Sequence, residues 1–239
     1  MGRVELTTFA DHHALAKTAA VAWLRQIEAT NDPDRSHCVA LSGGRIARAF
    51  FSLVVAVARA GANPLSRVHF FWADERCVPP EHAESNYRVA REVLFDPLGI
   101  PSLQVHRIQG EKPPEAAATQ AESEICRIAP LNRRGQPVLD LVFLGMGEDG
   151  HVASLFPGEP ETVKESTAVY RTVTAPKPPP ERITFGYSTI AVAREVWVLV
   201  SGTGKESALR DALASEGASP LCRVLRSRER TRIFSDVRA

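Results

Sequence analysis

Short runs of apolar residues alternate along the chain with longer stretches in which apolar residues recur every three or four positions. The runs cover residues 37–41, 68–72, 139–144 and 195–200, and a shorter run covers 231–234. Near-continuous apolar runs of about four to eight residues predict strands that are buried on both faces. We therefore expect five strands.

The stretches between the runs follow a helical period, because their apolar side chains fall on one face at spacings of three and four. The expected helices cover 15–27, 46–57, 85–95, 118–128 and a last stretch that ends at about Leu213. Ser85 is a candidate N-cap for the third helix. Gly61 and Pro64 end the second.

Strand and helix alternate throughout, which is typical of a mostly parallel sheet covered by helices on both faces. We expect a single α/β domain over residues 1–239, with a doubly wound sheet. In such sheets ligands bind at the carboxyl ends of the strands. The functional residues should therefore follow Leu41, Trp72, Leu144 and Val200.

Composition narrows the classes of function. Basic and acidic residues number 29 and 28, so the chain lacks the basic excess on which nucleic-acid and membrane-surface binding depend. No window approaches the ~18 consecutive apolar residues that a membrane-spanning helix needs. The four cysteines lack the close pairs of zinc and redox motifs. We expect free thiols, no nucleic-acid or membrane partner, and a cytoplasmic protein.

The first two strand-end loops suggest anion binding. In the loop at 42–45, Gly43 and Gly44 allow the backbone to approach an anion at the start of a helix, where N–H groups are free. A tight structural turn is the alternative. In the loop at 72–80, Arg76 is a candidate clamp for phosphate or carboxylate. A solvated cluster of ion pairs is the alternative there.

The third loop carries the strongest signal. It reads LGMGEDGHVASLFPG over residues 144–158, and three glycines within six residues allow a steep turn that ends at His151. A histidine ordinarily titrates close to neutral pH, which suits proton transfer. A lone histidine is more often structural, but the glycine turn, the strand end and Asp149 together favour a catalytic role.

The fourth loop, SGTGK at 201–205, resembles the end of a P-loop. A P-loop needs an earlier glycine, and position 199 is Leu, so we exclude nucleotide binding. Lys205 can still neutralise a phosphate at the start of a helix, although a solvated lysine is an equal alternative.

Four pieces of sequence are spread in order over nearly the whole chain: WADERCVPPEHAESNY, LDLVFLGMGEDGHVASLFPG, PPERITF and SGTGK. Together they resemble the 6-phosphogluconolactonase family. The resemblance implies hydrolysis of 6-phospho-D-glucono-1,5-lactone to 6-phosphogluconate, the second step of the oxidative pentose phosphate pathway. It also implies a sugar-phosphate lactone as the small-molecule partner and no metal or organic cofactor. We expect a monomer or a weak homodimer.

We expect His151 to act first as a general base and then as a general acid. Neutral His151 takes a proton from the water that attacks the lactone carbonyl, and its imidazolium protonates the leaving ring oxygen. Asp149 either orients His151 or stabilises the turn. Arg76 and Lys205 are candidates for holding the 6-phosphate with the glycine loop, and the sequence leaves open which of them faces the oxyanion.

One departure from the family pattern lies in the first glycine loop. The family usually continues S-G-G-S-T-P, whereas this chain has Arg45-Ile46-Ala47, without hydroxyl groups. We expect Arg45 to be partly exposed near the phosphate end of the pocket, in place of the missing hydroxyls.

Two rival functions remain. A glucosamine-6-phosphate deaminase-like isomerase of related fold would carry N-G-H followed by an F-N-E-P type sequence. This chain has Asp149 and S-L-F-P-G there instead. A non-catalytic sugar-phosphate sensor is disfavoured by intact His151, Arg76 and Lys205, while the altered Arg45 leaves it open.

Overall fold

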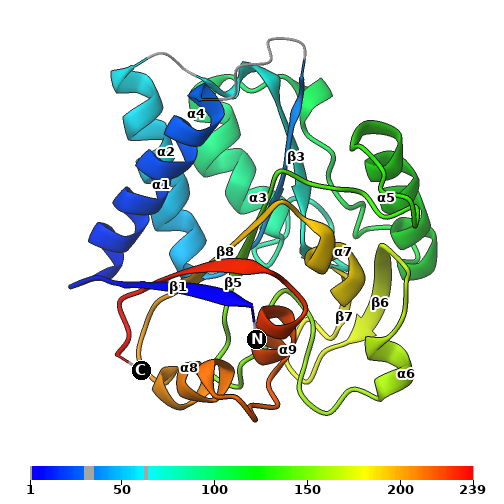
Figure 1. Ribbon diagram of the computed structural model, residues 1–239. Helices are drawn as coiled ribbons and strands as arrows, with labels where there is room; N and C mark the ends of the chain where they lie inside the picture. Colours follow the sequence, from blue (N-terminus) through cyan, green and yellow to red (C-terminus); the bar gives the residue numbers. More distant parts are fainter. Residues whose placement is uncertain (1, 30–34, 62–63, 239) are drawn as a thin grey trace.

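Six parallel strands form the central sheet of the computed structural model, which describes residues 2–29, 35–61 and 64–238 (Figure 1). Their order across the sheet is β1-β9-β8-β5-β2-β3. The strands are β1 (Arg3–Thr8), β2 (His37–Leu41), β3 (Val68–Trp72), β5 (Leu141–Gly145), β8 (Glu195–Val200) and β9 (Arg230–Ser235). The five strands that the sequence predicts are confirmed, with ends shifted by one or two residues in β5 and β9.

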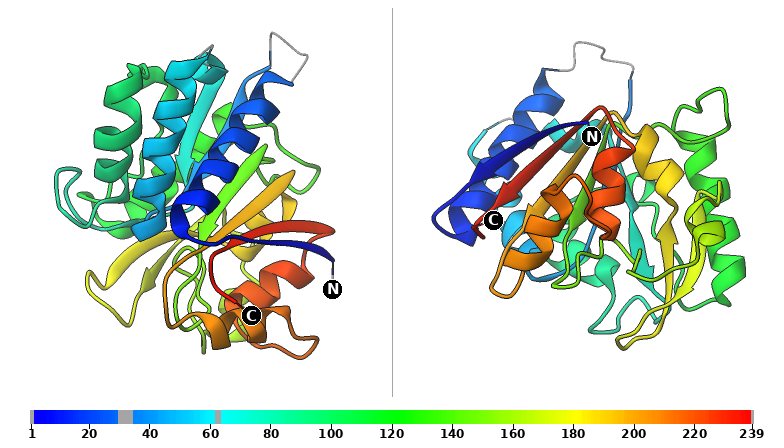
Figure 2. Two further views of the ribbon diagram at one scale, coloured as in Figure 1. Left: turned by 90° about the vertical axis from the view of Figure 1, so that its left-hand side faces the viewer. Right: turned by 60° about the horizontal axis from the view of Figure 1, so that its bottom comes forward.

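Helices cover both faces of the sheet, so the predicted doubly wound α/β class is confirmed. Helices α1 and α2 pack together on one face, and α7, α8 and α9 lie on the other (Figures 1 and 2). The helices are α1 (His12–Glu28), α2 (Arg45–Ala60), α3 (Asn86–Ala90), α4 (Asp96–Leu98), α5 (Pro114–Ile128), α6 (Glu161–Lys164), α7 (Tyr187–Val192), α8 (Glu206–Leu213) and α9 (Pro220–Arg226).

The predicted helix over 85–95 is confirmed with an irregularity. Ser85 is its N-cap, and the Ser85 hydroxyl accepts the N–H of Arg88 at 3.2 Å. After α3 the chain makes a π-helical turn over Arg91–Phe95 before α4. The sequence did not predict this widening, because the apolar period is the same through both parts.

Strand β1 was missed because it is the edge strand, paired only with β9, and most of its side chains are exposed. Its polar sequence, RVELTT, therefore lacks the apolar run of a buried strand.

A second, antiparallel sheet was also missed. It consists of β4 (Asp74–Arg76), β7 (Glu181–Phe185) and β6 (Tyr170–Thr174), in that order. The Tyr170 hydroxyl donates to the carbonyl of Trp72 at 2.7 Å and so ties this sheet to the end of β3. Because the start of β4 follows closely on the end of β3, the small sheet lies beside the carboxyl edge of the large one.

Aromatic side chains anchor the sheet beneath that edge. The Phe143 ring of β5 lies 4.7 Å from Phe50 of α2 and 5.2 Å from Trp23 of α1, and all three are buried. Each such pair contributes ~0.5–1.5 kcal/mol beyond its buried area. The strand ends that carry the loops are therefore held rigidly.

Cys38, Cys77, Cys126 and Cys222 are all free, as predicted. No helix within the described residues is long and apolar enough to cross a membrane.

Candidate active site

The loops at the carboxyl edge of the large sheet meet in one pocket of about 110 Å³. Six residues predicted as site residues line it: Gly43, Gly44, Arg45, Arg76, His151 and Lys205. The seventh, Asp149, lies behind His151 and contacts its ring. Loops that are far apart in the sequence are thus brought together, as parallel strand ends require.

His151 is held by its own loop. Its Nδ1 lies 2.5 Å from Oδ1 of Asp149, and its backbone carbonyl accepts the N–H of Gly147 at 2.9 Å. A Cβ on Gly147 would lie 2.1 Å from two atoms of the imidazole ring. Only glycine leaves space for the ring here, so the glycine turn and the histidine form one unit.

The contact with Asp149 favours the tautomer of His151 in which Nδ1 carries the proton. Burial by itself raises the pKa of Asp149, but the hydrogen bond and charge of His151 outweigh it and lower the pKa below its usual value. An ionised carboxylate accepts a hydrogen bond from Nδ1–H, and in the neutral imidazole the lone pair then lies on Nε2. Among the described residues Nε2 has no hydrogen-bond partner, and the side chain is 22% exposed in the pocket.

The first glycine loop presents the start of α2 to the pocket. Gly44 has φ +96° and provides no side-chain cap, so the first N–H groups of the 16-residue helix remain available to an anion. A Cβ on Gly43 would lie 1.8 Å from Oδ1 of Asn86. The glycine therefore allows the loop to lie directly against α3.

Arg45 and Lys205 come from two different loops and line the same pocket. Arg45 is exposed, and its Nη2 lies 3.5 Å from the position that a Cβ on Gly202 would occupy. Burial lowers the pKa of Lys205, and the positive charge of Arg45 lowers it further. An anion between the two cations would relieve this repulsion.

Arg76 has a cationic partner that sequence reasoning missed. Arg76 of β4 and Arg182 of β7 are paired across the small antiparallel sheet, and Arg182 is only 7% exposed. Burial lowers the pKa of Arg182, and Arg76 lowers it further. Arg182 lies within the PPERITF piece, but only the β4–β7 register brings it to the pocket.

These cations differ in how far they are neutralised. Arg76 reaches the carboxylate of Glu84 at 3.3 Å, while its Nε is buried without a partner. Within the described residues, Arg45, Arg182 and Lys205 have no carboxylate at ion-pair distance. The pocket therefore holds an unbalanced positive charge.

Two carboxyl groups shape the second loop. Asp74 lines the pocket and accepts the hydroxyl of Ser154 at 2.7 Å. Glu75 points away and accepts the N–H groups of Asn86 and Tyr87, both at 2.8 Å. Burial raises the pKa of Glu75 to about 7, against the lowering effect of these N–H groups. The loop is thus pinned to the start of α3.

Sequence reasoning also did not assign a role to Asp74, Asn86 or Ser201, which line the pocket too. Asp74 and Ser201 each follow a buried strand, and this position could have marked them. In the described part of the chain no three His, Cys, Asp or Glu side chains form a group that could hold a metal ion.

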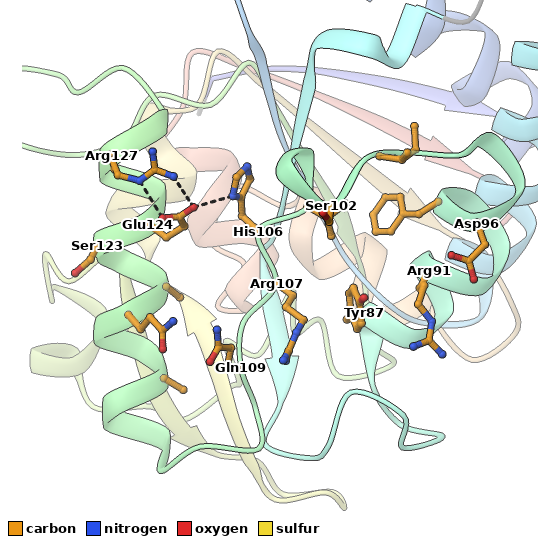
Figure 3. Close-up of a pocket in the computed structure, with 16 residues that line it drawn as sticks. Tyr87, Arg91, Asp96, Ser102, His106, Arg107, Gln109, Ser123, Glu124 and Arg127 are labelled. Carbon is orange, nitrogen blue, oxygen red and sulfur yellow. Dashed lines mark hydrogen bonds and ion pairs between the residues drawn. The ribbon is translucent and has the colours of Figure 1, made fainter.

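A larger pocket of about 720 Å³ lies elsewhere, between α5 and the segment from α3 to α4 (Figure 3). Each of its three arginines has a bidentate carboxylate partner. The pairs are Arg91 with Glu81, Arg107 with Glu111 and Arg127 with Glu124. The positive charges of this pocket are therefore balanced by carboxylates of the protein itself, unlike those of the smaller pocket.

Comparison with known proteins gives one consistent family. The model of glucosamine-6-phosphate isomerases/6-phosphogluconolactonase matches residues 10–233. A probable chloroplastic 6-phosphogluconolactonase 3 of Oryza sativa subsp. indica is 38% identical over 76% of this chain, and the chain covers 57% of that relative's length. The 6-phosphogluconolactonase of Treponema pallidum is 38% identical over 76% of this chain and 73% of its own.

Solved structures agree with the fold. The 6-phosphogluconolactonase of Trypanosoma brucei superposes with a TM-score of 0.87 at 27% identity, covering 98% of this chain and 97% of that one. A monomeric glucosamine-6-phosphate deaminase gives a TM-score of 0.79 at 17% identity, which shows a shared fold alone.

Proposed function

The chain belongs to the glucosamine-6-phosphate isomerase/6-phosphogluconolactonase family, and we propose that it hydrolyses 6-phospho-D-glucono-1,5-lactone to 6-phosphogluconate. The observation that carries the proposal is the position of His151: among the described residues its Nε2 has no hydrogen-bond partner, and it lies in a pocket most of whose cations have no carboxylate partner. The lactone is neutral apart from its phosphate, so the cations serve that group and the charge that develops during the reaction.

In the first step His151 acts as the general base. Its Nε2 takes a proton from water while the water oxygen bonds to the lactone carbonyl carbon, which gives a tetrahedral oxyanion. The carboxylate of Asp149, 2.5 Å from Nδ1, stabilises the imidazolium that forms. Asp149 thus acts by orienting and stabilising His151, without contact to the substrate.

In the second step the bond between the carbonyl carbon and the ring oxygen breaks. The imidazolium of His151 returns its proton to that oxygen, which becomes the hydroxyl of the open acid. A positioned acid–base group typically contributes ~10²–10⁴-fold to the rate. A lactone hydrolyses unaided, so this factor together with the positioning of water is sufficient.

The phosphate binds to the cations of the pocket. Arg76 and Lys205 hold it, Arg182 adds a third cation, and Arg45 lies at the exposed rim. The N–H groups at the start of α2, next to Gly43 and Gly44, complete the site because the positive end of the helix dipole favours an anion.

The deciding experiment compares two substrates. The purified protein should hydrolyse 6-phosphogluconolactone faster than the spontaneous reaction, and unphosphorylated gluconolactone should be a poor substrate. Hydrolysis at the spontaneous rate, with retained binding of 6-phosphogluconate, would indicate a sugar-phosphate sensor instead. Release of ammonia from glucosamine 6-phosphate would indicate the deaminase chemistry.

A further inference from the structure

Asp236 lies directly after β9, outside the set of residues that line the pocket, and binds the neighbouring strand-end loop. Its Oδ2 accepts the hydroxyl of Ser201 at 2.7 Å, and its Oδ1 accepts the N–H of Gly202 at 3.2 Å. Its own N–H donates to the carbonyl of Val200 at 3.2 Å. These bonds fix the first two residues of the 201–205 turn against the end of β9.

The fixed turn decides where both cations at this end of the pocket lie. Gly202 and Gly204 have φ of +98° and +83°, a backbone course that leads to Lys205 at the start of α8. The guanidinium of Arg45 lies against Gly202. A shift of Gly202 would displace the support of Arg45 and the backbone that carries Lys205 together.

We infer that Asp236 is a positioning residue for the anion site: by holding Ser201 and Gly202 it sets Lys205 and Arg45 to face the same phosphate. The inference rests on the proposed function and adds to it a residue that does not contact the substrate.

The charge of Asp236 acts on the anion site in two opposed ways. A carboxylate near a phosphate opposes phosphate binding by Coulomb repulsion, while the same charge raises the pKa of Lys205 and so favours its cationic form. An effect of charge alone would be the same in Asp236→Ala and Asp236→Asn, because both variants lose the charge. If Asp236 acts through its two hydrogen bonds to the turn, Asp236→Ala weakens binding and Asp236→Asn does not. Comparison of the two variants therefore separates the roles.

The test uses Asp236→Ala and Asp236→Asn in the full chain. Calorimetry with inorganic phosphate and with 6-phosphogluconate measures binding, and lactone hydrolysis separates KM from kcat. In D236A we expect binding to weaken about tenfold, the change that loss of ~1.4 kcal/mol gives, with kcat within about twofold. D236N keeps a carbonyl oxygen for Gly202 and can donate to Ser201, so it should restore affinity to at least that of the parent.

Asp11→Ala provides the matched control. Asp11 lies on the same side groove as Asp236, and its carboxylate caps α1 through the N–H of Ala14 at 2.8 Å without bonding the 201–205 turn. Phosphate affinity should be unchanged in D11A. If D236A does not fold, Ser201→Ala can replace it, because it removes one of the two hydrogen bonds between Asp236 and the turn. Ser201→Ala should weaken phosphate binding about threefold, which is less than the tenfold loss expected for D236A.

The outcomes separate the inference from the proposed function. Parent-like or tighter phosphate binding in D236A, or an equal loss in D236N, would overturn the positioning role even if the parent is an active lactonase. A parent that binds phosphate but opens no lactone would overturn the proposed function, and the D236A and D236N affinities would still decide the positioning role. A parent that binds neither anion would overturn both.

Discussion

Each of the two pockets contains a histidine whose Nδ1 faces a carboxylate, yet the two histidines are in different chemical situations. In the larger pocket Nδ1 of His106 lies 3.0 Å from Glu124, and its Nε2 lies 2.8 Å from Nδ1 of His69. In the smaller pocket Nδ1 of His151 faces Asp149, and Nε2 has no partner among the described residues. Of these two histidines, His151 is the one with a nitrogen free to take a proton from water.

The cations of the two pockets differ in the same way as the histidines: within the described part of the chain, those of the larger pocket are paired within the protein, and most of those in the smaller pocket are not. The larger pocket is about 720 Å³ but pairs each arginine with a carboxylate, whereas the pocket of about 110 Å³ leaves Arg182 and Lys205 without a carboxylate partner among the described residues. A side chain that is already paired within the protein gains little by binding a ligand, because it must first give up its partner. Unpaired charge and an unpaired imidazole nitrogen, and not volume, therefore favour the smaller pocket as the candidate site.

The largest expected effect tests the histidine comparison. His151→Ala should lower kcat by ~10²–10⁴-fold, because the proton-transfer group is lost. Binding of 6-phosphogluconate, measured by calorimetry, should change little. Near-normal turnover in this variant would show that another group is the base.

His106 provides the matched control for that prediction. His106→Gln removes the carboxylate-paired imidazole of the larger pocket. The value of kcat per folded molecule should stay within about twofold of the parent, because both nitrogens of His106 are already bonded within the protein and neither can transfer a proton to the substrate. A loss similar to that of His151→Ala would break the comparison between the two pockets.

The next effect tests the cations. Lys205→Ala and Arg182→Ala should each weaken binding of the phosphorylated lactone by ~1.5–3 kcal/mol, the range for hydrogen bonds to charged groups. Arg76→Ala should follow the same pattern. KM and kcat for phosphorylated and unphosphorylated lactone are the measurements. Equal losses on both lactones would place the substituted cation at the reacting carbonyl instead of the phosphate.

Much of the smaller pocket could be predicted from the sequence, because the residues that line it follow single strands. Each buried strand ends where an apolar run ends, and parallel strands bring those ends to one edge. By this rule His151 and Lys205 were predicted to lie at that edge, and both line the smaller pocket there. Asp236 follows the last strand in the same manner and could have been found by it.

The rest depends on long-range pairing, which apolar periodicity does not encode. Arg182 reaches the pocket only through antiparallel pairing of β7 with the three-residue strand β4, which is too short to give a pattern. The pairs Arg107–Glu111 and Arg91–Glu81 are close in sequence and were missed for another reason: they depend on side-chain direction, which apolar periodicity does not encode either. A sequence shows which residues are charged, but it does not show which of them form ion pairs with one another.

A smaller effect is expected at the rim. Arg45→Ser should raise KM for the phosphorylated lactone by up to about fivefold, the upper range for an exposed charge. The increase should be larger in low salt than in high salt, because mobile ions screen an exposed guanidinium. Steady-state kinetics at two ionic strengths measure this. Equal KM values for parent and variant at both ionic strengths would mean that Arg45 plays no part in phosphate binding.

The smallest effect is expected in the larger pocket. Arg107 donates two hydrogen bonds of 2.9 and 2.7 Å to the carboxylate of Glu111. Its guanidinium lies 5.6 Å from the centre of the Tyr87 ring, and both of these side chains line the larger pocket (Figure 3). Arg107→Ala removes a cation from the wall of the larger pocket, just as Arg182→Ala removes one from the wall of the smaller pocket. KM and kcat should nevertheless stay within about twofold of the parent, because a partnered ion pair and a cation–π contact of ~0.5–1 kcal/mol contribute to stability alone.

Phosphate affinity separates the two roles of arginine, because loss of either side chain also removes contacts that stabilise the fold. Arg107→Ala should lower the melting temperature slightly while phosphate affinity stays constant. Arg182→Ala should lower phosphate affinity. If Arg107→Ala weakened phosphate binding as strongly as Arg182→Ala, then an arginine neutralised by its own carboxylate would still act on the ligand. The rule drawn from the two pockets, that a site is marked by charge the protein leaves unpaired, would not hold for this protein.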